Sequence, residues 1–297
     1  LTLFANKSSI NRYQMSNSFP KSQEQYWSTE GGDIWLQNLQ NFESMIAPIG
    51  KHLLETKLTD KHKNIIDIGC GGGATTFAIA DSMGASGSVI GVDISQSLIR
   101  DCRLRAEHQG IKNIEFICGD AASIDMPKVW ADFVISRFGV MFFKDPVIAF
   151  SHIAQSLKPS GELAFSCWAP LPDNPWMSRL LTILGKYTAL PKPEPGAPGP
   201  FAYSNTDYIR LILASAGYQN IEVEAWSGEL LIGLPGMSPE NVARFLFSSS
   251  SLVRSVKNNI TEMETTIFDE FTQELAKFYK NGGVYMPAKS WIISATK

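Results

Sequence analysis

The chain has 297 residues, of which 44% are hydrophobic and 19% charged, a composition typical of a globular protein with a core large enough to fold without disulfides or structural metals. The formal net charge of -3 excludes a broadly basic nucleic-acid-binding surface, and no apolar run approaches the roughly 20 residues that a membrane-spanning helix needs. The four cysteines form no Cys-x-x-Cys pair, so we expect reduced thiols, no metal site and a cytoplasmic location.

The first predicted segments are helical. Residues 1–22 are polar and lack the apolar region of a secretory signal, so we expect a flexible arm, with Met15 as an alternative natural start. Between Gly32 and Leu58 the apolar residues recur at helical spacing. Pro48 is predicted to divide this stretch into two helices, because proline removes a backbone donor.

Short apolar runs then alternate with helical stretches. The runs are short enough for buried strands, and they cover residues 64–68, 88–93, 114–118, 131–136 and 162–167. Capping residues open two of the intervening helices, Ser95 in one and Asp145-Pro146 in the other. This alternation is typical of a doubly wound parallel sheet in an α/β protein.

The amino-acid composition changes after Trp168. Residues 170–203 are rich in proline and glycine, and we expect a loop there that caps a ligand crevice. The α/β pattern returns with a helix at 206–216, a strand at 221–225 and a final strand at 285–296. The predicted organisation is an arm (1–22), N-terminal helices and ligand-binding core (23–169), a cap loop (170–203), and the rest of the core with a helical insertion at about 238–280 (204–297).

The strongest motif is Asp67-Ile68-Gly69-Cys70-Gly71-Gly72-Gly73-Ala74, which fits G-x-G-x-x-G/A between a strand and a helix. Two acids decide which ligand it suits. Asp93 ends the next strand, where a carboxylate accepts hydrogen bonds from the hydroxyls of a ribose. Asp67 precedes the first glycine by two residues and would repel a pyrophosphate. A nucleoside that carries an ammonium and a sulfonium, as S-adenosylmethionine does, suits both acids.

Several segments resemble class I S-adenosylmethionine-dependent methyltransferases. Residues 64–76 look like their first motif, Val92-Asp93 like the ribose-binding acid, and Gly119-Asp120-Ala121 like the adenine-contacting segment. Residues 136–143 and 157–163 are similar to two later motifs, and residues 25–35 to the opening of the ubiquinone/menaquinone-biosynthesis subgroup. The resemblance is strong over 25–168. It implies a Rossmann-like seven-stranded sheet whose last strand is antiparallel and lies between two others, with a helical and loop cap over the substrate.

The resemblance implies S-adenosylmethionine as cofactor and S-adenosylhomocysteine as product. The residues expected to bind the cofactor are Tyr26, Trp27, Asp67, Gly69, Cys70, Gly71, Asp93, Ile94, Asp120, Ala121 and Ser136. Three of these assignments have structural alternatives. Tyr26 and Trp27 fit a packing role equally well, Asp93 could cap a helix, and Asp120 could serve only its turn.

The acceptor side is less sharply defined. Methyl transfer to a positioned nucleophile needs a base only when a proton must leave, and the four histidines fall on or near predicted helices, so no catalytic residue is assigned. Residues around the fourth strand and the cap favour an apolar or aromatic small molecule, and they are Arg137, Phe138, Met141, Trp168 and Trp176. A structural ion pair is the alternative for Arg137.

The sequence therefore predicts an enzyme that methylates a small molecule by in-line displacement, without nucleic-acid or integral membrane contacts. The Asn/Asp-Pro-Pro-Tyr/Phe motif of amino-directed methyltransferases is missing after the fourth strand. A non-catalytic S-adenosylmethionine-binding protein is the first alternative. A nicotinamide-dependent oxidoreductase is disfavoured by Asp67. The oligomeric state stays open, with a homodimer among the alternatives.

Overall fold

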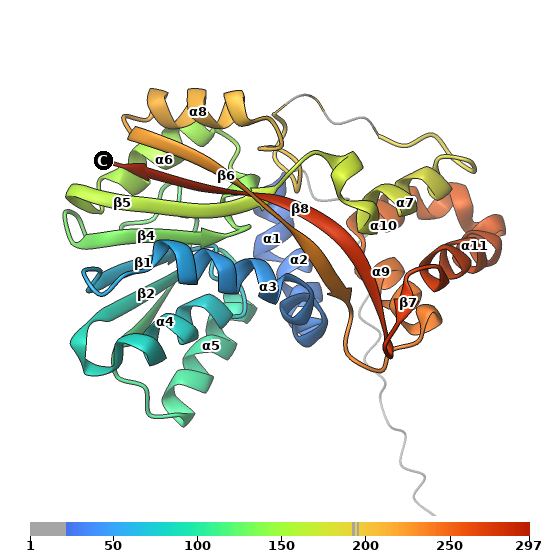
Figure 1. Cartoon of the computed structure of the whole chain (residues 1–297), viewed down its shortest axis with the longest axis horizontal. Helices are drawn as coiled ribbons and strands as arrows, with labels where there is room; N and C mark the ends of the chain where they lie inside the picture. The colour runs from blue at the N-terminus through green and yellow to red at the C-terminus, as the bar shows by residue number, and fades with distance from the viewer. Residues whose placement is uncertain (1–21, 192–193, 195) are drawn as a thin grey trace, which may run out of the picture.

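The computed structural model describes residues 22–191, 194 and 196–297, so the arm expected before Ser22 lies outside the described residues. The described chain forms an eight-stranded sheet with helices on both faces (Figure 1). Its strands are β1 (Asn64–Ile68), β2 (Ser88–Asp93), β3 (Ile114–Cys118), β4 (Ala131–Arg137), β5 (Leu157–Trp168), β6 (Gln219–Ile232), β7 (Tyr279–Lys280) and β8 (Gly283–Thr296).

The strand order is β3-β2-β1-β4-β5-β8-β6, with β7 paired to β8. Strands β1 to β5 pair in parallel, whereas β8 is antiparallel to both neighbours, β5 and β6. The doubly wound sheet and the antiparallel last strand between two others are confirmed. The eighth strand is β7, two residues long, which is too short to carry a sequence pattern.

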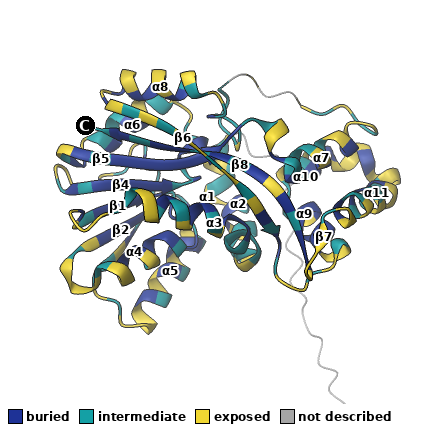
Figure 2. Cartoon of the chain, viewed as in Figure 1, coloured by how far each residue is buried: buried dark blue, intermediate teal, exposed yellow. Residues whose placement is uncertain are grey.

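Eleven α-helices lie in the described residues. They are α1 (Gln23–Ser28), α2 (Glu30–Gln37), α3 (Leu39–Lys57), α4 (Ala74–Met83), α5 (Gln96–His108), α6 (Pro146–Ala154), α7 (Pro175–Leu184), α8 (Thr206–Ser215), α9 (Pro239–Ser249), α10 (Ser251–Ile260) and α11 (Glu264–Ala276). Figure 2 shows buried residues along the sheet and on the inner helix faces, with exposed residues outside. None of these helices is both long and apolar enough to cross a membrane.

The capping predictions hold at two helices. Ser95 Oγ accepts from the backbone N–H of Leu98 at 3.4 Å and opens α5. Asp145 Oδ1 accepts from the N–H of Ile148 at 3.0 Å and opens α6. Each cap satisfies a donor that the first helical turn would otherwise leave unpaired, which fixes where the helix begins.

The predicted break at Pro48 was wrong, because α3 runs unbroken through it. Proline costs this helix one backbone hydrogen bond. Apolar residues on both sides of Pro48, including Met45, Ile49 and Leu53, are buried in one core cluster. Burial of this continuous stripe holds both halves of the helix against the sheet and offsets the lost bond.

The cap differs from the prediction in two places. Residues 175–184 of the expected loop form α7, which buries Trp176, Leu180 and Leu184 at helical spacing, while 192–193 and 195 lie outside the described residues. The loop composition of 191–200 hid this helical stripe. Strand β6 is also much longer than the predicted 221–225, because it pairs with β8 along its whole length as far as Ile232 (Figure 1).

Candidate functional site

The glycine loop between β1 and α4 is wound tightly. Gly69, Gly71 and Gly73 have φ angles of 65°, 55° and 77°, a left-handed conformation that side chains rarely adopt. A Cβ on Gly69 would lie 2.6 Å from Cα of Gly139, so the loops that follow β1 and β4 touch through their backbones. The backbone N–H of Gly69 donates to Val92 O at 2.8 Å and ties the loop to β2. The motif therefore needs glycine both for its conformation and for space.

Asp93 closes this loop from the end of β2. Its Oδ2 accepts from the N–H of Gly71 at 2.8 Å, and its Oδ1 accepts from the N–H of Ser95 at 2.8 Å. Burial raises its pKa, and the backbone donors oppose that rise. The cap of α5 is Ser95, so the helix-cap alternative for Asp93 does not describe it. Each oxygen has a second acceptor position for a ligand hydroxyl.

Asp67 lies deeper, 1% exposed at the end of β1. Its Oδ2 accepts from Thr76 Oγ1 at 2.7 Å, and its Oδ1 has no partner among the described residues. Burial raises its pKa to about 7, against the lowering effects of the Thr76 hydrogen bond and the charge of Arg137. A carboxylate of this kind gains stability when a cation approaches it.

The loop after β3 lies beside Asp93, since the N–H of Gly119 donates to Asp93 O at 2.9 Å. Asp120 Oδ1 accepts from the N–H of Ala122 at 2.9 Å, as its turn alternative requires. Ser136 Oγ donates to Ile68 O at 2.7 Å and is fully buried, so this hydroxyl joins β4 to β1. Three further expected cofactor residues line the same strand ends, and they are Cys70, Ile94 and Ala121.

Helix α2 lies over the glycine loop. A Cβ on Gly32 would stand 2.1 Å from Ser95 Oγ, so the helix backbone presses on the start of α5. The indole Nε1 of Trp35 is 3.7 Å from the place a Gly71 Cβ would take. Trp35 thus lies at the loop, whereas the sequence predicts cofactor contacts for Tyr26 and Trp27. Trp35 follows Gly32 by three residues on α2, so the two lie on the same side of the helix, and this spacing could have indicated Trp35.

Tyr26 and Trp27 have other contacts. The hydroxyl of Tyr26 accepts from Arg254 Nη2 at 2.9 Å. The Trp27 ring packs edge-on against Phe142 and Trp35, with ring centroids 4.9 Å and 6.0 Å apart. Both rings thus have contacts within the protein, while the indole N–H of Trp27 has no hydrogen-bond partner among the described residues.

Buried polar atoms without hydrogen-bond partners gather in this region. Among the described residues, five such side-chain atoms belong to the α1–α3 segment and to β1: Trp27 Nε1, Trp35 Nε1, Asn41 Oδ1, Glu43 Oε1 and Asp67 Oδ1. Two are donors and three are acceptors. Buried polar groups are normally paired, so this set suits a ligand that carries both an anionic and a cationic group.

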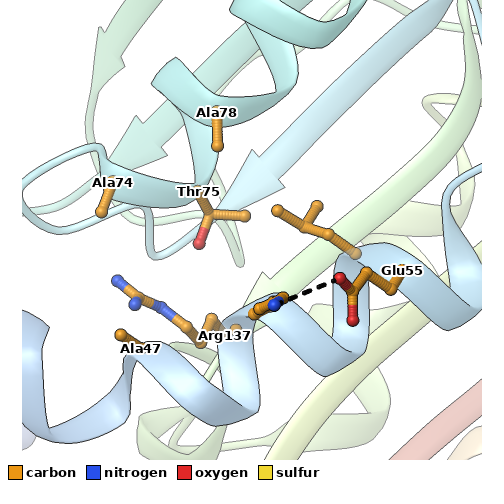
Figure 3. A pocket seen from close by; sticks show the side chains of 9 residues that line it. Ala47, Glu55, Ala74, Thr75, Ala78 and Arg137 are labelled. Carbon is orange, nitrogen blue, oxygen red and sulfur yellow. Dashed lines mark ion pairs between the residues drawn. The ribbon is translucent and has the colours of Figure 1, made fainter.

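Arg137 turns away from the predicted acceptor residues toward α3. Its guanidinium, with 8% of the side chain exposed, pairs with Glu43, and its Cδ is 2.8 Å from the place of a Gly50 Cβ. It lines a cavity of about 340 Å³ between α3 and α4 and points toward Ala74 and Thr75 at the start of α4 (Figure 3). The ion-pair alternative is what the structure shows.

The comparisons with known proteins agree with this geometry. Residues 59–182 match a family model described as a methyltransferase domain. The chain is 33% identical to aklanonic acid methyltransferase DauC of Streptomyces sp. (strain C5) over 40% of its length and 54% of that protein. It is 26% identical to demethylmenaquinone methyltransferase of Staphylococcus carnosus over 60% of its length and 77% of that protein. The chain thus spans about half of the first relative.

A solved structure extends the likeness of the fold. Phosphoethanolamine N-methyltransferase 2 of Haemonchus contortus, in complex with phosphomonomethylethanolamine and S-adenosylhomocysteine, aligns with a TM-score of 0.56 at 18% identity. The alignment covers 93% of this chain and 60% of that one. Residues 59–182 therefore belong to a methyltransferase domain, and the solved structure shows that the fold extends over most of the chain. The family and cofactor class expected from the sequence are confirmed.

The remaining predicted acceptor residues of the methyltransferase lie together in the core. Phe138 stacks on Trp168 at a ring-centroid distance of 4.3 Å, and Trp168 contacts Trp176 of α7 at 5.0 Å. Met141 is buried in the same core cluster, and its carbonyl accepts from the N–H of Gly199 at 3.0 Å. Phe138 has the left-handed φ of 63° directly after β4, and its ring packs on Trp168 whereas Arg137 pairs with Glu43 of α3.

Proposed function

We propose that this protein transfers the methyl group of S-adenosylmethionine to a small, apolar or aromatic acceptor by in-line displacement. The bond between the methyl carbon and the sulfonium breaks as the acceptor's lone pair forms the new bond, and the electron pair stays on sulfur in S-adenosylhomocysteine. The observation that carries the proposal is the glycine loop tied to Asp93 on one strand end, with the half-satisfied Asp67 buried beside it.

The residues would divide the cofactor between them. Asp93 would accept from the ribose hydroxyls, and the loop of Asp120 would contact the adenine. Asp67 would accept from the ammonium group, because its second oxygen is buried and unpaired among the described residues. Arg137 and Thr75, which line the cavity next to the glycine loop, would receive the carboxylate. The orphaned donors and acceptors nearby fit such a zwitterion.

The acceptor would lie on the cap side, near Phe138, Trp168 and Trp176. Stacked aromatic rings exclude water and can align an acceptor with the sulfonium. Two relatives are named for methylation of aklanonic acid and demethylmenaquinone, both small organic molecules. We also propose that the protein works in a reducing compartment such as the cytoplasm, since its four cysteines are free in the described structure.

Calorimetry followed by a turnover assay tests the proposal. We expect S-adenosylhomocysteine to bind with a Kd in the micromolar range, about -8 kcal/mol, and NAD not to bind. Labelled S-adenosylmethionine should then transfer its methyl group to a member of a panel of quinols, phenols and polyketide-like compounds. Binding without turnover on such a panel would favour a non-catalytic binding protein. NAD binding without S-adenosylhomocysteine binding would favour the oxidoreductase.

A further inference from the structure

Helices α1 and α2 lie between the glycine loop and the helical insertion of 238–280, as Figure 1 shows. On the loop side, Gly32 presses on Ser95, and Trp35 stands at Gly71. These two contacts cover the ends of β1 and β2, where the cofactor is proposed to bind. Movement of α2 would therefore change how a ligand reaches the strand ends at Gly71 and Ser95.

On the other side, a single guanidinium holds both N-terminal helices. Arg254, on α10, donates from Nη2 to the Tyr26 hydroxyl at 2.9 Å, and its Nε pairs with Glu30 Oε1 at 2.9 Å. Its Nη1 donates to Ser248 O at 3.1 Å. Arg254 thus joins α1, α2 and the corner between α9 and α10. The rigid, planar guanidinium makes these three contacts from three separate nitrogens, whereas the three donors of an ammonium group all start from one nitrogen.

The helix that carries Arg254 is packed into the core of the cap. Its neighbours Val253 and Val256 on α10 are buried, and the side chain of Arg254 itself is only 24% exposed. A second contact joins the same two parts of the molecule. Phe42 of α3 packs edge-on against Phe245 of α9, with ring centroids 5.1 Å apart. The N-terminal helices are therefore fastened to the cap by both polar and aromatic contacts.

We infer that Arg254 is a positioning residue that couples the helices covering the cofactor to the acceptor-side cap, so that the two open as one unit. The inference rests on the proposed function. Its consequence is that the cap governs cofactor exchange. An acceptor bound beneath the cap then slows release of the cofactor, and by thermodynamic reciprocity a bound cofactor stabilises the closed cap.

The test uses the full chain with Arg254→Met, and Arg244→Met as a matched control. Arg244 lies on α9 of the same cap, with 67% of its side chain exposed, and pairs only with Glu240 of its own helix among the ion pairs of the described residues. We expect Arg254→Met to speed amide hydrogen exchange of residues 30–37 without any ligand, and to speed dissociation of S-adenosylhomocysteine, each by about 3- to 10-fold. Arg244→Met should match the wild type in both measurements.

Further variants keep the result decisive. Arg254→Lys should give an intermediate rate, and Tyr26→Phe should add little to Arg254→Met, since both remove the same contact. An unchanged exchange rate in α2, a uniform rise that includes β1, or an unchanged dissociation rate would each overturn the coupling. If the wild type binds no S-adenosylhomocysteine, the proposed function fails. Amide hydrogen exchange in α2 still decides whether the contacts of Arg254 with Tyr26 and Glu30 hold that helix in place.

Discussion

Two regions of the molecule are held together by different kinds of contact. One is the region of β1, β2 and the glycine loop, called here the cofactor half because the cofactor is proposed to bind there, and the other is the cap. In the cofactor half, the loop of residues 69–73, the ends of β1 and β2 and the first turn of α4 supply the polar partners of Asp67 and Asp93. In the cap, the contacts join segments far apart in the chain, such as Tyr26 with Arg254 and Phe42 with Phe245. We expect the first region to tolerate few changes, because its glycines adopt left-handed conformations and Asp93 accepts from two backbone N–H groups. The second depends on packing, which many residues share.

The largest effect is expected for Asp93→Ala. It removes the acceptor proposed for the ribose hydroxyls and also the carboxylate that accepts from the N–H groups of Gly71 and Ser95. We expect S-adenosylhomocysteine to bind about 30- to 1,000-fold more weakly, equivalent to about 2–4 kcal/mol, as calorimetry would show. Asp101→Ala, at a half-exposed ion pair on α5, is the control. Wild-type affinity in Asp93→Ala would remove Asp93 from the site.

Gly69→Ala tests how little the glycine loop tolerates. The new Cβ would face Cα of Gly139 at 2.6 Å and sit at a φ of 65°. We expect a loss of about 2–4 kcal/mol in the free energy of unfolding, measured in urea. Gly110→Ala is the matched control, because it shares a positive φ of 67° but meets no atom within 4 Å. Equal losses in both variants would mean that strain alone, without the contact between loops, sets the cost.

The pKa of Asp67, raised to about 7, makes stability depend on pH. The unfolded carboxyl ionises near 4 and the folded one near 7, so the unfolded state binds fewer protons between these values and stability falls as pH rises from about 4 to 7. Asp67→Asn keeps a partner for Thr76 and removes the charge. We expect it to stabilise the ligand-free protein by about 1–3 kcal/mol at pH 8 and to flatten this slope.

Asp67→Asn should make the protein more stable but its cofactor binding weaker. Asp67→Asn should weaken S-adenosylhomocysteine binding, because the ammonium loses its acceptor. Wild-type affinity should rise with pH toward 7 as the carboxyl ionises. A variant that is no more stable than the wild type at pH 8, in thermal unfolding followed by circular dichroism, would show that Asp67 is not a buried charge in the free protein.

The smallest effect is expected in the cap. Trp176 of α7 is 8% exposed and packs against Trp168. Trp176→Phe keeps an aromatic ring there but makes it smaller, so the contact with Trp168 is reduced. We expect a few-fold loss in kcat/KM for the acceptor, with little change in cofactor affinity. Trp291→Phe, whose indole N–H donates to Ser204 O at 2.9 Å on the opposite face of the sheet, is the control. Equal kinetics in both variants would place the acceptor elsewhere.

The sequence could predict the cofactor half because its information is local. The glycine loop, Asp67 and the cap at Ser95 each depend on neighbours within a few residues, so spacing alone indicates their geometry. The same reasoning reached Asp93, because parallel strands end at one edge. The antiparallel last strand between two others followed from the family resemblance.

The rest could not be predicted for physical reasons. The pairing of Arg254 with Tyr26 joins residues 228 positions apart, and no spacing rule connects them. Arg137 and Phe138 are adjacent, yet Arg137 pairs with Glu43 of α3 and Phe138 packs on Trp168, and neither partner is close in sequence. Helix α7 was hidden by proline-rich neighbours, and Pro48 was tolerated because tertiary packing outweighed its local cost.

The placement of β8 has a consequence for how the protein reaches its native state. The strands β1 to β5 precede it by more than a hundred residues, and all the expected cofactor residues lie before it. Until β8 inserts between β5 and β6, β5 is an edge with unpaired backbone groups, and such edges invite pairing with other chains. During synthesis, the nascent first half is thus at risk of aggregation, and slow, long-range closure by β8 sets how long that exposure lasts.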